Sequence, residues 1–275
     1  MRVDSHHHFW NYDPSEYGWI GEGMDVLKKD FGPTGLASCA EATKMEGFVS
    51  VQARQSVEET KWLCGFAEES PLIKGVVGWV PLVDSEVSSI LDAVSSPWLK
   101  GIRHAVQGEP DPNFILGKEF NRGIETLAAY GLVYDILIFG KQLSPSIQFV
   151  DKHPDLPMVL DHIAKPVIHE VAFDEPWATG FREIAKRENL VCKFSGVVTE
   201  VRDKAWSIDL IKPYWEVALE SFGPQRLLFG SDWPVCLLKS DYERWVGAVE
   251  ALVGELSPDE QAHIMGLNAK RVYAL

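Results

Sequence analysis

Residues 73–81 read IKGVVGWVP, and this stretch decides the fold. The apolar residues of its centre, GVVGWV, follow one another without the alternation expected of a strand with one face in water. A continuous apolar run of this length is typical of a strand buried on both faces in a parallel sheet. Residues 227–230, which read LLFG, have the same character. Both runs therefore favour an α/β fold.

Eight β-rich segments alternate with helical patterns along the whole chain. The predicted strands cover Arg2–His8, Gly47–Ala53, Ile73–Pro81, Leu99–Ala105, Leu132–Ile138, Met158–Ile163, Val191–Ser195 and Arg226–Asp232. This alternation predicts a (β/α)8 TIM barrel of the α/β class in one domain, residues 1–275, with the Trp10–Pro33 loop folded over one end. An open doubly wound sheet is the alternative, but no glycine-rich phosphate loop follows any strand.

Local signals mark several helix ends. The patterns at residues 56–59 (SVEE) and 257–260 (SPDE) predict capping boxes, in which the serine and the acid three residues later satisfy free backbone N–H groups. Gly131 follows an apolar helical stripe and predicts a C-terminal cap.

The composition disfavours several classes of partner. The 275 residues carry a formal net charge of −14, which opposes binding to nucleic acid and to anionic lipid. No uninterrupted apolar stretch of about 18 residues exists, so no membrane span is expected, and the N-terminus does not resemble a secretory signal. Cys39, Cys64, Cys192 and Cys236 lie far apart and are expected to be free thiols of a cytoplasmic protein. The oligomeric state stays open, a homo-oligomer included.

In a TIM barrel the reactive side chains come from the C-terminal ends of the strands. Every predicted strand ends in polar or aromatic residues, which are His6, His7, His8, Gln52, Arg54, Trp79, Arg103, His104, Tyr134, Asp135, Asp161, His162, Lys165, Lys193, Ser195, Ser231 and Asp232. We therefore expect these side chains to meet at one mouth of the barrel.

The histidine run His6-His7-His8 ends the first predicted strand. Side chains two apart in a strand share a face, so His6 and His8 point the same way and His7 points oppositely. Two imidazoles on one face are spaced to bind one metal ion. The remnant of an affinity tag is the alternative, but a tag is usually longer and is not followed at once by a strand-to-loop transition such as FWNYDP.

Asp232 follows the buried LLFG run and is predicted to lie in the mouth. Apolar walls there would raise its pKa and suit it to act as a general base. The alternative is that its carboxylate caps a turn. His162 closes the sixth strand, either as a mouth residue or as a hydrogen-bonded core histidine.

Two cations also lie at predicted strand ends. Arg103 needs an anionic or carbonyl partner, which is either a substrate or a neighbouring carboxylate such as Asp135. Lys193 is costly to bury and is a candidate for polarising a substrate carbonyl. Tyr12 and Trp233 offer flat faces for a sugar ring, although aromatic residues in barrels are more often core.

Six motifs together resemble the amidohydrolase superfamily (amidohydrolase family 2) and, within it, a sugar-lactonase branch that includes L-fuconolactone and L-rhamnonolactone hydrolases. They are DSHHHFWNYDPSEYGWI, GIRHAVQGEPDP, GLVYDILI, VLDHIAKP, CKFSGVVTE and LLFGSDWPVCLL, which span essentially the whole chain. The resemblance implies a barrel enzyme that acts on a small sugar lactone.

The resemblance also implies a ligand set for metal. His6 and His8 match the superfamily's strand-1 pair, His162 its strand-6 histidine and Asp232 its strand-8 aspartate. Many members bind one or two divalent metals with a further carboxylated lysine or a strand-5 histidine. Here Tyr134 and Asp135 stand at the strand-5 end. We therefore expect at most one ion, such as zinc, bound by His6, His8 and Asp232, and a metal-free enzyme is the alternative.

The expected reaction is the hydrolysis of a sugar aldonolactone to the sugar acid, with Asp232 activating water. The other predicted catalytic residues are His162, His6, His8 and Lys193. The residues predicted to bind the substrate are Arg103, His104, Trp79, Gln52, Tyr12 and Trp233. A metal-dependent decarboxylase of the same superfamily and a non-catalytic sugar-binding barrel are the alternatives.

Overall fold

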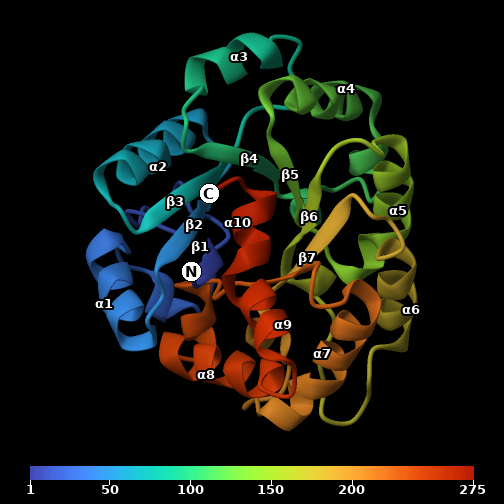
Figure 1. Ribbon diagram of the computed structural model, residues 1–275. Helices are drawn as coiled ribbons and strands as arrows, with labels where there is room; N and C mark the ends of the chain where they lie inside the picture. Colours follow the sequence, from blue (N-terminus) through green and yellow to red (C-terminus); the bar gives the residue numbers. More distant parts are fainter.

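The computed structural model describes all 275 residues, and eight parallel strands form a barrel at its centre (Figure 1). The strands are β1 (Val3–His7), β2 (Gly47–Val51), β3 (Ile73–Gly78), β4 (Leu99–His104), β5 (Val133–Ile136), β6 (Met158–Leu160), β7 (Leu190–Phe194) and β8 (Leu227–Phe229). Each strand pairs with the next in chain order, from β1 to β8. This order confirms the predicted (β/α)8 barrel.

The barrel closes where the chain after β8 returns to β1. The Asp232 N–H donates to the His6 carbonyl at 2.8 Å, and the His8 N–H donates to the Trp233 carbonyl at 2.7 Å. These two bonds set the residues after β8 directly beside the histidine run. They also show that the run belongs to the barrel, so the affinity-tag alternative is wrong.

The helices surround the barrel. They are α1 (Pro33–Thr43), α2 (Val57–Glu69), α3 (Val87–Val94), α4 (Lys118–Leu127), α5 (Leu143–Lys152), α6 (Glu175–Ile184), α7 (Ile208–Phe222), α8 (Tyr242–Val253), α9 (Pro258–Ala262) and α10 (Asn268–Val272). No candidate membrane-spanning segment is found among these helices. All four cysteines are free thiols, as predicted.

The barrel interior explains the continuous apolar runs. Val77 of β3 belongs to a small cluster of buried residues inside the barrel, whereas Val76 belongs to the large cluster between strands and helices. Ala269 and Tyr273, at the end of the chain, join the inner cluster and close the N-terminal end of the barrel, where Figure 1 shows α10 in front of the strands. Both faces of the strands are therefore buried, except at the half-buried Lys74 and Lys100 near the start of β3 and β4.

The predicted caps are confirmed with one exception. Ser257 and Glu260 form a reciprocal capping box, and Gly131 adopts a left-handed conformation with φ of 63°. Ser56 accepts from the Glu59 N–H, but the Glu59 carboxylate does not return to Ser56. It accepts instead from the N–H groups of Ala53 and Arg54, both at 3.0 Å. Only the serine half of the predicted capping box therefore forms, because the Glu59 carboxylate binds N–H groups in the loop after β2 instead of the N–H of Ser56.

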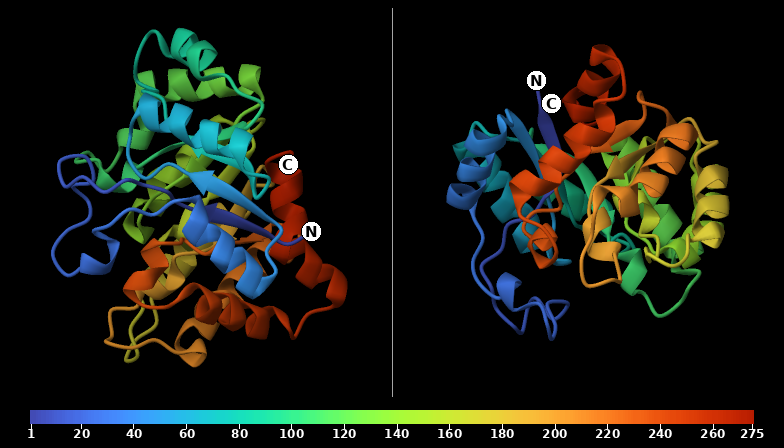
Figure 2. Two further views of the ribbon diagram at one scale, coloured as in Figure 1. Left: turned by 90° about the vertical axis from the view of Figure 1, so that its left-hand side faces the viewer. Right: turned by 90° about the horizontal axis from the view of Figure 1, so that it is seen from below.

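The segment Trp10–Pro33 forms a loop over one end of the barrel. Trp10 and Phe31 pair at its base through backbone hydrogen bonds of 3.0 and 2.8 Å. The left panel of Figure 2 shows this loop on the side of the molecule opposite to both termini. The loop therefore covers one end of the barrel, as predicted, and this end is the C-terminal mouth.

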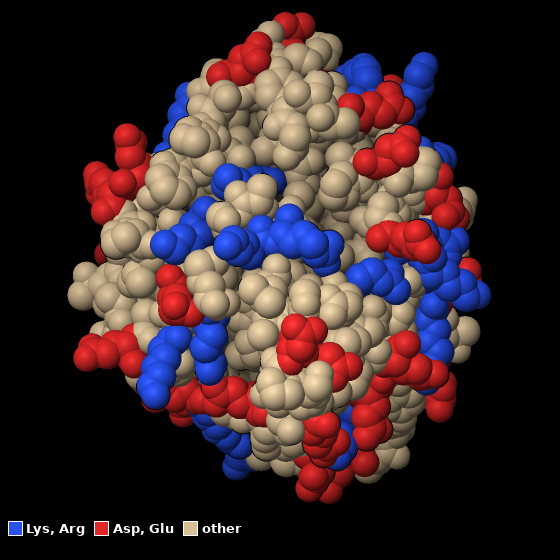
Figure 3. All heavy atoms as spheres, in the orientation of Figure 1, with Lys and Arg blue, Asp and Glu red and all other residues tan.

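The negative net charge is not spread evenly. On the face that carries the C-terminus, basic side chains form a band across the middle, and acidic side chains gather mainly around its lower half (Figure 3). Parts of the surface are therefore locally positive although the net charge of the chain is negative.

Candidate active site

A cavity of about 460 Å³ opens at the C-terminal mouth of the barrel. Strand ends and the segments just after them contribute His8, Gln52, Arg103, His162 and Asp232 to its lining. The surrounding loops contribute Glu16, Gly18, Trp19, Ala53, Arg54, Gln55, Ala105, Gln107, Gly108, Glu109, Leu137, Lys165 and Val235. Most of the lining residues are thus polar or charged, and the cavity lies where barrel enzymes carry their reactive groups.

Three imidazoles converge on one oxygen of Asp232. The Oδ1 atom lies 3.2 Å from His8 Nε2, 3.8 Å from His6 Nε2 and 3.8 Å from His162 Nε2. All four side chains are buried. The structure therefore brings together four residues that the sequence assigned to three different strand ends.

The second nitrogens of two of these rings are fixed by hydrogen bonds. His8 Nδ1 lies 2.7 Å from the Val51 carbonyl, which can only accept, so this nitrogen carries the proton. In neutral His8 the lone pair of Nε2 then faces Asp232 Oδ1, and two acceptors meet at 3.2 Å. His162 Nδ1 is held by the Ser195 hydroxyl at 2.8 Å. A proton or a cation is needed between His8 and Asp232.

The charge states suit a cation. Burial alone would raise the pKa of Asp232, but His162, the hydrogen bond with His8 and the ammonium of Lys165 outweigh it and lower the pKa. The raised pKa expected from the sequence is therefore wrong. Burial lowers the pKa of His162 to about 4 and that of His6 well below its ordinary value. At neutral pH the carboxylate is ionised and these two rings are neutral, as metal ligands must be.

Asp232 does not cap a turn. Its carboxylate contacts imidazoles and accepts no backbone N–H. The capping alternative is excluded for this structure.

A left-handed turn aims His162 at Asp232. The φ angles of His162, Ile163, Ala164 and Lys165 are 55°, 48°, 58° and 48°. Such angles cost roughly 1–2 kcal/mol per residue for L-amino acids. Trp177 Nε1 donates to the Ile163 carbonyl at 2.6 Å and holds the turn. The strand predicted to reach Ile163 ends at Leu160 for this reason.

Gly196 makes room for this arrangement. Its φ is 63°, and a Cβ atom there would lie 2.7 Å from His162 Nδ1 and 3.0 Å from Asp232 Oδ2. Only glycine combines the backbone conformation with the missing side chain.

A network of buried charges lies around His6. Arg103 Nη1 is 3.1 Å from His6 Nε2 and 2.9 Å from Asp161 Oδ2. Lys193 Nζ is 3.2 Å from His6 Nδ1, 3.1 Å from Asp161 Oδ1 and 2.6 Å from Asp135 Oδ2. The suggested pairing of Arg103 with Asp135 is wrong, because Lys193 occupies Asp135 and Arg103 turns to Asp161.

Lys193 is fully buried and does not line the cavity. Asp135, its partner, also accepts from the Tyr273 hydroxyl at 2.8 Å. The ammonium of Lys193 thus lies behind His6, away from the cavity. In this place it can hold His6 but does not reach a ligand in the cavity.

The residues predicted to bind the substrate divide into two groups. Gln52 and Arg103 line the cavity, whereas the others, His104, Trp79, Tyr12 and Trp233, do not. Trp79 Nε1 donates to His104 Nδ1 at 3.3 Å, and His104 Nε2 lies 2.6 Å from Glu109 Oε1. These two residues therefore support Glu109, which does line the cavity.

Tyr12 and Trp233 lie in the packing around the mouth. Trp233 is buried, with its ring centre 5.3 Å from that of Phe31. Tyr12 donates its N–H to Asp30 within the Trp10–Pro33 loop. Loop residues that the sequence did not suggest, such as Glu16 and Gln107, take their place, because no strand pattern locates a loop residue.

Four buried polar atoms of the lining residues have no protein partner. They are Gln52 Nε2, Arg54 Nε, Arg103 Nε and Gln107 Oε1. Buried polar groups are nearly always hydrogen-bonded, so three free donors and one free acceptor indicate a site for a polar ligand.

Two sets of side chains have ligand atoms within 4.8 Å of one another. They are His6, His8 and Asp232, and His6, Asp161 and His162. Both sets need His6, which already has the cations Arg103 and Lys193 at its two nitrogens. The two candidate sets therefore share His6, and a cation held by either set would lie close to Arg103 or Lys193.

Comparison with known proteins places the chain in a family. Residues 3–275 match the amidohydrolase family model. The L-fucono-1,5-lactonases of Burkholderia multivorans and Burkholderia ambifaria are 39% and 31% identical, each aligned over 100% of this chain and 96% of the relative. A crystal structure of an amidohydrolase from Burkholderia multivorans with bound zinc is 38% identical, with a TM-score of 0.97, and covers 100% of this chain and 99% of that chain. The protein belongs to the amidohydrolase family.

Proposed function

We propose that this protein is a lactonase that hydrolyses a sugar aldonolactone to the open-chain sugar acid. The observation that carries this proposal is the convergence of His6, His8 and His162 on ionised Asp232. His8, His162 and Asp232 line the cavity, and His6 lies buried directly behind them. Full-length relatives that are named L-fucono-1,5-lactonases support it. An L-fuconolactone-like substrate is therefore the first to test.

Asp232 acts as the base in this proposal. Its carboxylate takes a proton from water as the water oxygen attacks the lactone carbonyl. The bond between the carbonyl carbon and the ring oxygen then breaks. The proton held by Asp232 passes to the ring oxygen, which becomes the new hydroxyl group, and the carboxylate of Asp232 is regenerated.

Arg103 and Gln52 bind the substrate. Arg103 is 3% exposed and lines the cavity, so its guanidinium can offset the negative charge that grows on the carbonyl oxygen. Gln52 Oε1 and the Gln52 carbonyl hold Arg103 Nη2 at 3.0 and 2.5 Å. Gln52 Nε2 and Gln107 Oε1 then remain free for sugar hydroxyls.

His6, His8 and Asp232 are proposed to hold one divalent cation, with zinc as the first candidate. The facing acceptors of His8 and Asp232 fit a cation, and Lys193 holds His6 in place from behind. A bound zinc ion supplies a Lewis acid and lowers the pKa of water.

The test is a panel of aldonolactones, including L-fucono-1,5-lactone, assayed by acid release with a pH indicator. Zinc is measured in the same preparation, and Asp232→Asn serves as the control. Acid release that depends on Asp232 is expected for at least one lactone. Carbon dioxide release from hydroxybenzoates without lactone hydrolysis would favour a decarboxylase, and sugar binding without any turnover would favour a non-catalytic barrel.

A further inference from the structure

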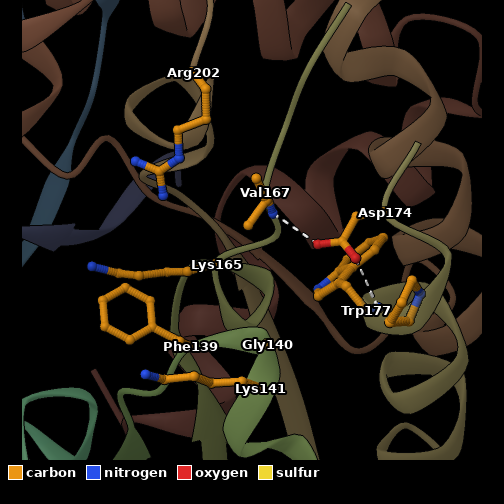
Figure 4. Close-up of a pocket in the computed structure, with 9 residues that line it drawn as sticks. Phe139, Gly140, Lys141, Lys165, Val167, Asp174, Trp177 and Arg202 are labelled. Carbon is orange, nitrogen blue, oxygen red and sulfur yellow. Dashed lines mark hydrogen bonds between the residues drawn. The ribbon is translucent and has the colours of Figure 1, made fainter. Parts of the chain in front are cut away.

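A second cavity of about 420 Å³ lies beside the active-site cavity. The segment before α5, the turn after β6 and the start of α6 form its walls (Figure 4). We call it the side cavity. Its lining residues are Phe139, Gly140, Lys141, Lys165, Val167, Asp174, Pro176, Trp177 and Arg202.

Three cations gather on one side of the side cavity. Figure 4 shows Lys141 and Lys165 flanking the ring of Phe139, with Arg202 nearby. The Nζ atoms of Lys141 and Lys165 lie 5.8 and 5.7 Å from the centre of this ring. Both ammonium groups are thus close enough to the ring to be attracted by it, and they bring two positive charges to this side of the cavity.

Few protein carboxylates offset these charges. Glu200 pairs with Arg202 at 3.0 Å and lies 3.9 Å from Lys165 Nζ, so one carboxylate serves two cations. Lys141 has no carboxylate partner of this kind. In a chain with a net charge of −14, such a group of cations is unusual and favours an anionic ligand.

The opposite wall suits a polyhydroxylated ligand. Asp174 accepts from Val167 N–H at 2.9 Å and from Trp177 N–H at 3.1 Å, one bond at each oxygen. Each oxygen keeps a lone pair for a hydroxyl group. The half-buried ring of Phe139 offers apolar surface to C–H groups, whereas Trp177 is buried behind this wall. Inorganic phosphate would use only the cations, whereas a sugar acid would use both walls.

Lys165 connects the two cavities. It lines both of them, and it ends the left-handed turn that begins at His162. A carboxylate formed beside His162 and Asp232 thus meets Lys165 at the boundary between the cavities.

We propose that the side cavity binds the open-chain sugar acid, with its carboxylate at Lys141, Lys165 and Arg202 and its hydroxyl groups toward Asp174. The proposal rests on the lactonase function, because that reaction forms such an acid in the adjacent cavity. The side cavity is then a product site on the way out of the enzyme.

The test is calorimetric titration with L-fuconate, which needs no turnover. Lys141→Gln with Arg202→Gln should weaken binding at this site by about tenfold or more, since two charged contacts are lost. Lys152→Gln, an exposed lysine at the end of α5, is the matched control and should leave the isotherm unchanged. L-fucitol, which lacks the carboxylate, should not bind, and inorganic phosphate should bind more weakly than L-fuconate.

Two outcomes overturn this inference. One is an identical L-fuconate isotherm in the wild type and the double variant. The other is binding of phosphate as tight as that of L-fuconate, which would make the side cavity a simple anion site. Lactone hydrolysis is assayed separately on the same preparations. Hydrolysis without variant-sensitive L-fuconate binding refutes the side-cavity proposal alone, whereas variant-sensitive binding without hydrolysis refutes the lactonase proposal alone.

Discussion

Asp232 Oδ1 lies 3.2 Å from His8 Nε2, although the two residues are 224 positions apart in the sequence. The Val51 carbonyl holds a proton on the other nitrogen of His8, so in the neutral form of His8 two acceptors would face each other. The backbone bonds that close the barrel, from Asp232 to His6 and from His8 to Trp233, impose this contact. The same closure that stabilises the fold therefore builds the reactive centre.

Asp232→Asn tests the proposed base. The amide keeps the shape of the side chain but cannot take a proton from water, so kcat for the best lactone should fall by about 100-fold or more. Steady-state kinetics measure this loss, and a melting temperature close to that of the wild type confirms that the variant is folded. Near-normal turnover would remove Asp232 from the mechanism.

His8→Ala tests the cation site. Zinc affinity, measured by titration of chelator-treated protein, should fall by at least about tenfold because one of three ligands is lost. His169→Ala replaces an exposed histidine outside the site and should bind zinc as the wild type does. Elemental analysis should find no more than one ion per chain. Two ions per chain, or equal affinity in both variants, would contradict the proposed ligand set.

Gly196→Ala tests the close approach of His162 and Asp232. The added Cβ would lie 2.7 Å from His162 Nδ1, so kcat/KM should fall by about tenfold or more as the two side chains are pushed apart. Gly65→Ala is the control, because a Cβ at this helical position meets nothing within 4 Å. It should raise stability by about 0.5–1 kcal/mol. Unchanged kinetics in Gly196→Ala would show that the site tolerates the shift.

Lys193→Met tests the buried ion network. The substitution leaves the carboxylates of Asp135 and Asp161 without their common partner, and loss of a buried ion-pair partner costs about 3–5 kcal/mol. Urea unfolding measures this cost. Lys186→Met, at an exposed ion pair, should change stability by less than about 1 kcal/mol. Adding Asp135→Asn to Lys193→Met should restore part of the lost free energy of unfolding. If Lys193→Met alone lost no stability, the network would contribute none.

Glu59→Gln tests a predicted pH dependence of stability. Burial raises the pKa of Glu59 to about 7, above its ordinary value of 4.5. As the pH is lowered, the folded state therefore takes up this proton at a higher pH than the unfolded state does. The resulting stabilisation is complete below about pH 4.5 and is lost as the pH rises through about 7.

The free energy of unfolding of the wild type, relative to that of Glu59→Gln, should thus rise by about 2 kcal/mol when the pH is lowered from 8 to 5. Urea unfolding at unit steps of pH measures this difference. Parallel stability curves for the two proteins would show that Glu59 titrates normally.

Much of the barrel was predictable from the sequence. The runs GVVGWV and LLFG predicted strands that are buried on both faces. In β3, Val77 packs inside the barrel and Val76 packs against the helices. The H-x-H spacing placed His6 and His8 on one face, since the side-chain direction in a strand alternates with every residue. These properties depend on neighbours in the chain, so the order of residues alone carries them.

The partners and charge states in the site were not predictable in this way. Nothing in the order of residues shows that Arg103 pairs with Asp161 and not with Asp135, and this pairing follows from the ion pair between Lys193 and Asp135. The pKa of Asp232 moves down and not up because three groups from other strands and loops outweigh its burial. The sequence by itself determined the barrel and the residue types at its mouth, which follow from local periodicity. Only the tertiary structure decided which of these groups touch, because electrostatic interactions act over a few ångströms in space and not along the chain.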